Sequence, residues 1–147
     1  MQVWGVTDIG LVRKENQDAY LVRESGGHTI CVVCDGMGGR LASQIATETF
    51  VDELERLLAP GMEPEQLLSI SARAVFAANQ AVREAAAESE AYQNMGTTLV
   101  AAVSYAGGTV VTNVGDSRAY HVTREGITRV TKDHSLVERM VDRGDIT

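Results

Sequence analysis

Short apolar segments alternate with polar, glycine-containing turns through the first third of the chain. Their lengths and their β-branched residues are typical of strands rather than helices. The segment from Ile30 to Cys34 is apolar at every position, which indicates a strand that is buried on both faces. The pattern predicts strands at residues 3–7, 18–23 and 29–34.

Two longer segments with helical spacing follow the glycines at positions 36, 38 and 39. The first covers residues 41–58 and is ended by Pro60-Gly61. The second runs from Pro64 to Ala87, and proline suits an early helical position because the missing N–H is not needed there. Apolar residues recur along both segments at helical intervals, so each is expected to present one face to the core.

The last part of the chain returns to the strand pattern. The intervening turns are short, and short connections favour antiparallel pairing because a parallel crossover needs about a dozen residues or more. A final segment, 135–143, has the apolar spacing of a short helix. The whole pattern predicts an α+β sandwich. Its later strands are expected at residues 97–105, 109–114, 118–123 and 127–130.

Composition narrows the functional classes. The chain has 147 residues, of which 44% are hydrophobic, and this suits one domain with one core. Thirteen Lys and Arg against twenty Asp and Glu give a formal net charge of -7, so the basic surface of a nucleic-acid binder is missing. The start shows no secretory leader, and no segment has the roughly 20 apolar residues of a membrane span. We therefore expect a cytoplasmic domain with no nucleic-acid or membrane partner.

The two cysteines, Cys31 and Cys34, have the C-x-x-C spacing of redox pairs and zinc half-sites. They lie in the predicted strand, however, and side chains three positions apart on a strand point to opposite faces. A redox or zinc role would require the two thiols to converge. Two small buried hydrophobic residues are the better interpretation.

Three aspartates stand at the edges of apolar strands: Asp18, Asp35 and Asp116. An ionised carboxylate near a buried strand end is costly unless it is paired or bound to a metal. Carboxylate-rich oxygen coordination is what Mg²⁺ and Mn²⁺ prefer, and Gly36 would let a backbone carbonyl approach a cation closely. Each aspartate alone fits a turn or helix cap equally well, but the three together favour a metal site.

Arg13 precedes Asp18 by five positions. A guanidinium could hold two phosphate oxygens at once, although a solvated surface arginine is the simpler interpretation of this residue alone. The glycine-rich run at 35–39 has neither a Walker lysine nor the G-x-G-x-x-G spacing, and no serine stands in a G-x-S-x-G turn. His134, in Asp133-His134-Ser135, could donate a proton, but helix capping by Asp133 or Ser135 explains this triplet more simply.

Five motifs follow one another along the chain. They are Arg13 with Asn16-Gln17-Asp18, then Val33-Cys34-Asp35-Gly36-Met37-Gly38-Gly39, Gly96-Thr97-Thr98, Asn113-Val114-Gly115-Asp116-Ser117-Arg118, and Thr131-Lys132-Asp133-His134-Ser135. In this order they strongly resemble the bacterial type 2C, metal-dependent serine/threonine protein phosphatases, and the resemblance covers the whole chain.

The resemblance implies a β-sandwich flanked by helices, in αββα layers. It also implies hydrolysis of phosphoserine and phosphothreonine in proteins by metal-activated water, in opposition to a serine/threonine kinase. Asp35 would bridge two Mn²⁺ or Mg²⁺ ions, with Asp18 and the Gly36 carbonyl as further ligands. Arg13 would hold the phosphate, and Asp116 would help to bind a third ion. A bridging carboxylate fits this chemistry, because two close cations acidify a shared water.

Three features depart from the family pattern. Met37 stands where eukaryotic relatives carry a histidine proposed as general acid. The stretch at 39–44 differs from the commoner Gly-His-x-x-Gly-Glu. The family's later Ser-Asp-Gly and Asp-Asn motifs, whose aspartates complete the two-metal centre, do not occur in this sequence.

Residues 1–147 are therefore expected to form a single phosphatase domain that is incomplete at its C-terminus, with little activity of its own. The alternative is a non-catalytic partial fold that binds a partner. Such a fold would also be able to self-associate through its unfinished sheet.

Overall fold

The computed structural model describes residues 1–134 of the chain. Both predicted helices are confirmed, and their ends agree with the prediction to within one residue. The helix predicted at 135–143 lies outside the described residues. In chain order the elements are β1 (Asp18–Ser25), β2 (His28–Met37), α1 (Leu41–Leu57), α2 (Pro64–Ala87), the 3-10 turn η1 (Glu90–Tyr92), β3 (Gly96–Thr97), β4 (Leu99–Tyr105), β5 (Gly108–Val114), β6 (Tyr120–Thr123) and β7 (Gly126–Arg129).

One antiparallel sheet organises the described part of the chain. Its order is β1-β2-β4-β5, with the two-residue β3 paired to the end of β2. The hairpin β6–β7 forms a separate two-stranded sheet. The α+β class and the antiparallel pairing predicted from the short turns are confirmed, except that β5 and β6 belong to different sheets.

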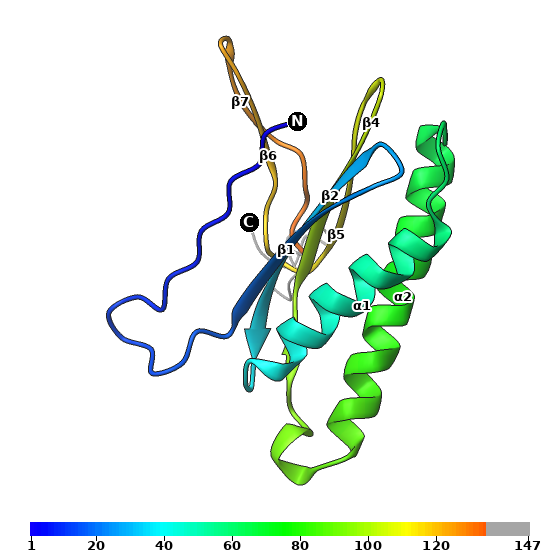
Figure 1. The fold of residues 1–147 in the computed structure, drawn as a ribbon. Coiled ribbons are helices and arrows are strands. Elements are labelled where there is room, and N and C mark those ends of the chain that lie inside the picture. Colours follow the sequence, from blue (N-terminus) through cyan, green and yellow to red (C-terminus); the bar gives the residue numbers. More distant parts are fainter. Residues whose placement is uncertain (135–147) are drawn as a thin grey trace, which may run out of the picture.

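Helices α1 and α2 cover one face of this sheet (Figure 1). A capping box begins α2, in which the side chains of Glu63 and Gln66 each accept a hydrogen bond from the other's backbone N–H. The core lies between the helices and the sheet, where the side chains of Ile30, Phe50 and Leu54 are fully buried. Burial of each such side chain contributes about 1.5–3 kcal/mol, so this layer holds the sheet in place.

The opposite face of the sheet is apolar, and residues 1–134 leave it largely uncovered. Tyr20 pairs with Val33 and Val22 pairs with Cys31 across β1 and β2. The side chains of Tyr20, Val22 and Val33 are 42%, 40% and 48% exposed. Residues 3–8 pass beside this face and enclose with it a cavity of about 450 Å³. We call this surface the open face.

The strand predicted at residues 3–7 is wrong. The segment pairs with no strand among the described residues, and Trp4 and Val6 are 82% and 91% exposed. Alternating apolar residues suit a strand, but a strand forms only where a neighbouring backbone offers its N–H and C=O groups.

The two cysteines point to opposite faces of the sheet, as predicted, but only Cys34 is buried as expected. Cys31 is partly exposed on the open face, whereas Cys34 is buried against the helices, and both are free thiols. Burial raises the pKa of the Cys34 thiol to about 12. A shared metal or a local disulfide is excluded by this geometry. None of the helices in the described range is both long and apolar enough to span a membrane.

Candidate metal centre

Asp18 and Asp35 lie side by side at one edge of the sheet. Asp18 is the first residue of β1, and the antiparallel register places it directly opposite Asp35 near the end of β2. The pKa of the Asp35 carboxyl is raised above its ordinary value, first by burial, and then by its hydrogen bond with Asp18 and the negative charge there. The charge of Arg13 opposes this shift. Two carboxylates this close create a site that a cation would stabilise.

A cavity of about 240 Å³ opens at this pair. Arg13, Asp18, Asp35 and Gly36 all line it, so the structure brings together four of the five residues singled out in the sequence. Asp116 is not among its lining residues. Four further polar residues also line the cavity and had no role assigned from the sequence: Asp8, Glu15, Asn16 and Gln17.

Gly36 is fixed by the loop that precedes β1. Its N–H donates to the Gln17 carbonyl over 3.1 Å, and a Cβ at this position would lie only 2.5 Å from the same oxygen. The buried Ser43 hydroxyl, in the first turn of α1, also donates to the Gln17 carbonyl, over 2.6 Å. The loop, the end of β2 and the start of α1 therefore meet at one carbonyl, and only glycine allows so close an approach.

Asn16 shapes the entrance to β1. Its side-chain oxygen accepts a hydrogen bond from the Asp18 N–H over 3.0 Å, and its amide donates to the Thr7 hydroxyl over 2.8 Å. The first of these is an Asx turn, which an Asn two positions before a strand could have suggested. Because it fixes the backbone of Asp18, Asn16 controls where that carboxylate points.

Asp116 sits on a turn between β5 and β6. Gly115 has a φ of +103°, which glycine adopts readily and other residues rarely do. The Gly115 carbonyl accepts hydrogen bonds from the His134 N–H over 2.8 Å and from the Asn113 side chain over 3.3 Å. The turn is therefore attached to the segment that follows β7.

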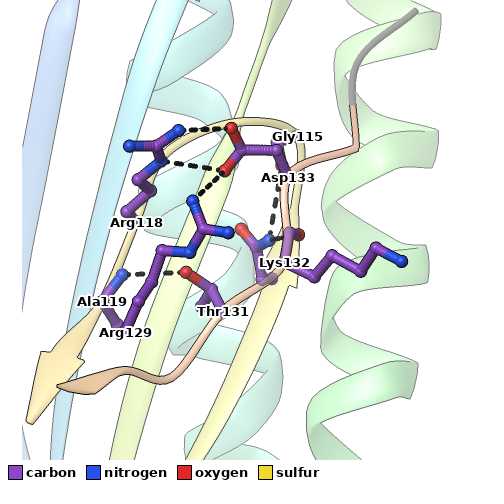
Figure 2. A network of polar contacts seen from close by, with 8 residues as sticks. Gly115, Arg118, Ala119, Arg129, Thr131, Lys132 and Asp133 are labelled. Carbon is purple, nitrogen blue, oxygen red and sulfur yellow. Dashed lines mark hydrogen bonds and ion pairs between the residues drawn. The ribbon is translucent and has the colours of Figure 1, made fainter. Parts of the chain in front are cut away.

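An ion-pair network closes over the same turn (Figure 2). Arg118 donates to both carboxylate oxygens of Asp133, over 3.0 and 2.7 Å, and Arg129 approaches the same carboxylate. The guanidinium of Arg118 lowers the pKa of Asp133. The Ala119 N–H donates to the Thr131 hydroxyl over 3.1 Å. Asp133 thus accepts hydrogen bonds from Arg118 and lies near Arg129, and the helix that it was expected to cap lies outside the described residues.

The donor set fits a hard divalent cation only in part. Two carboxylates and a glycine carbonyl are oxygen ligands of the kind that Mg²⁺ and Mn²⁺ prefer. Within residues 1–134, however, no group of three or more His, Cys, Asp or Glu side chains is arranged to hold a metal ion. The described residues thus offer two carboxylates and one carbonyl as candidate ligands, which is fewer than a divalent cation takes.

The family model of protein phosphatase 2C matches residues 12–138. The chain belongs to this family. The matched range includes the four residues that line the cavity of about 240 Å³. It also includes the turn that carries Asp116.

Relatives within the family extend well beyond this chain. The serine/threonine phosphatase stp of Listeria welshimeri is 36% identical over 96% of the chain, which spans 58% of that protein. The serine/threonine protein phosphatase PstP of Mycobacterium tuberculosis is 33% identical, and the chain spans 26% of it. The solved structure of phosphatase Stp1 from Staphylococcus aureus superposes with a TM-score of 0.86 at 33% identity, over 97% of this chain and 57% of that one. The mixed helix-and-sheet fold is therefore that of bacterial family members.

Proposed function

We propose that the protein carrying this chain hydrolyses phosphoserine and phosphothreonine in proteins and so opposes a serine/threonine kinase. One observation supports this above the others: Arg13, Asp18, Asp35 and Gly36 line the same cavity of about 240 Å³. Cation ligands and an anion-binding guanidinium in one small cavity suit a phosphate ester. The relatives that bear serine/threonine phosphatase names add weight to this substrate class.

In the proposed site Asp35, Asp18 and the Gly36 carbonyl would hold Mn²⁺ or Mg²⁺, with Asp35 as the central ligand. Bound metal would supply an acidified water as the nucleophile and neutralise phosphoryl charge. The chain's own residues hold the ions and orient the phosphate, which Arg13 grips through paired N–H groups. Asp116 would contribute to a third ion. We propose that aspartates outside these 147 residues complete the centre.

Replacing Arg13 with alanine is expected to raise the KM for a phosphoserine peptide by about 10- to 100-fold. A hydrogen bond to a charged group is worth about 1.5–3 kcal/mol, and 1.4 kcal/mol corresponds to a factor of ten. Arg13→Lys should recover only part of the loss, because an ammonium cannot make the paired contact. Steady-state kinetics at saturating Mn²⁺ would measure both. Lys14→Ala is the matched control, and an Arg13→Ala enzyme with unchanged kcat/KM would contradict the phosphate-binding role.

A second candidate function is self-association through the open face. The exposed side chains of Tyr20, Val22 and Val33 favour it, because contiguous apolar surface is what protein interfaces bury. Val33→Lys is then expected to convert a dimer into a monomer in sedimentation equilibrium. Phe76→Lys, which removes a 72% exposed apolar side chain from α2, is the matched control. A monomeric wild-type protein at every concentration would rule this function out.

A further inference from the structure

Next to the candidate metal centre, the hydrogen bonds between Asp35 and Thr98 depart from the regular antiparallel pattern. Val33 faces Val100 and Gly36 faces Thr97, so Asp35 stands opposite Thr98. The Thr98 N–H donates to the Asp35 carbonyl over 3.0 Å, as an antiparallel pair requires. The Asp35 N–H, however, donates to the side-chain hydroxyl of Thr98, also over 3.0 Å. The Thr98 carbonyl is occupied instead by the Thr97 hydroxyl, over 2.8 Å.

The same hydroxyl of Thr98 reaches the second acidic turn. It shares a short hydrogen bond with the hydroxyl of Ser117, which directly follows Asp116. A hydroxyl has one proton and two lone pairs, so it can accept from Asp35 and bond Ser117 at once. One side chain thus connects the backbone of Asp35 with the neighbour of Asp116.

Thr98 also fits the turn sterically. Its methyl group lies where a Cβ on Gly115 would come within 2.8 Å, so the turn packs directly against the threonine. Thr98 is only 8% exposed, and its two hydroxyl hydrogen bonds are partly shielded from water. Hydrogen bonds in such surroundings fix geometry more firmly than exposed ones.

We infer that Thr98 is the positioning residue that holds Asp35 and the Asp116 turn in one fixed arrangement. The inference rests on the proposed metal-dependent function, because its consequence is metal affinity. A hydrogen-bonded link between the two elements would set the separation of the two carboxylates before any metal binds. Loss of such an outer partner costs about 10- to 100-fold in metal affinity in other sites.

The hydrogen bond can be tested without any metal. Thr98→Val keeps the branched shape that packs against Gly115 but removes the hydroxyl, whereas Thr98→Ser keeps the hydroxyl. In the protein at its full natural length, amide hydrogen exchange at Asp35 is expected to be about tenfold faster in Thr98→Val. Thr98→Ser should exchange like wild type. Equal exchange in all three would overturn the inference.

The consequence is tested by titrating Mn²⁺ into the same proteins by calorimetry. Thr98→Val is expected to bind Mn²⁺ about 10- to 100-fold more weakly, with Thr98→Ser within about threefold of wild type. Ser117→Ala, which breaks only the far end of the link, should weaken binding less than Thr98→Val. A Thr98→Val protein that melts at a lower temperature but binds Mn²⁺ normally would show a merely structural role and overturn the inference.

Asp35→Asn separates this inference from the proposed function. If that variant loses Mn²⁺ binding while Thr98→Val retains it fully, the proposed function stands and the positioning role fails. If Asp35→Asn binds Mn²⁺ like wild type, the metal assignment itself fails, and the Thr98 inference about metal affinity fails with it. Loss of affinity in both variants, with rescue by Thr98→Ser, supports both.

Discussion

Replacing Asp35 with asparagine is expected to lower Mn²⁺ affinity by more than about 100-fold and yet to leave the metal-free protein no less stable than wild type. The loss should exceed the 10- to 100-fold effect of removing a mere outer partner of a ligand. Mn²⁺-dependent phosphopeptide hydrolysis should fall with it. Stability should not fall, because the Asp35 carboxylate faces Asp18 and is disfavoured in its ionised form.

The pH dependence follows from the direction of the Asp35 shift. Its pKa in the folded protein is raised above the ordinary value of 3.8, so the folded state holds this proton more tightly than the unfolded state. The resulting contribution to stability is fully present below pH 3.8 and is lost as pH rises through the folded pKa. Asparagine does not titrate. The metal-free variant should therefore lose less stability than wild type as pH rises through this window.

Calorimetry gives both quantities: Mn²⁺ titration for affinity, and thermal unfolding of the metal-free protein between pH 3 and 7 for stability. Asp52→Asn is the matched control, since Asp52 is an exposed aspartate of α1. It should change neither quantity. A lower melting temperature for metal-free Asp35→Asn at neutral pH would mean that Asp35 is a structural residue instead.

Much of the fold follows from local pattern. The limits of α1 and α2 could be predicted because Pro60-Gly61 and Pro64 mark them and apolar residues recur at helical spacing between. The conformation of residues 3–7 could not be predicted in this way, because a strand depends on a partner strand that the local sequence does not contain. Likewise β6 begins at Tyr120 rather than 118, since Arg118 is drawn to Asp133, fifteen positions away.

The candidate site also contains residues that the local sequence predicts and one that it does not. Asp18 and Asp35 are visible as carboxylates at strand edges, and antiparallel pairing of consecutive strands places them together. The role of Thr98 depends on how β4 pairs with β2 across more than sixty residues, and on Ser117 reaching the same hydroxyl. Hydroxyl residues are common, so nothing in the local sequence distinguishes this one. Thr98 is distinguished only by the register in which distant strands pair.

Gly36→Ala is expected to reduce stability by about 2–4 kcal/mol and to abolish the metal centre. Overpacking of this kind costs about 1–3 kcal/mol, and loss of the hydrogen bond from Gly36 to Gln17 adds about 1 kcal/mol. The new Cβ would lie 2.5 Å from the Gln17 carbonyl oxygen and 3.2 Å from both the Gly39 carbonyl and the Ser43 hydroxyl. The first obstacle is backbone, so it cannot be relieved by a side-chain rotation. The loop that carries Arg13 to Asp18 must move away from Asp35.

Gly96→Ala is the matched control for this effect. A Cβ on Gly96, in β3 beside the same end of β2, would meet only the flexible Met37 side chain, at 3.6 Å. Its stability should change by less than about 0.5 kcal/mol, and its Mn²⁺ affinity should not change. Urea unfolding and Mn²⁺ titration of the two variants measure this difference. Equal losses of stability in the two variants would show that backbone flexibility at these glycines matters, and not the close approach of Gln17 to Gly36. Losses of stability and of Mn²⁺ affinity in Gly36→Ala alone would show that the metal centre depends on the loop before β1.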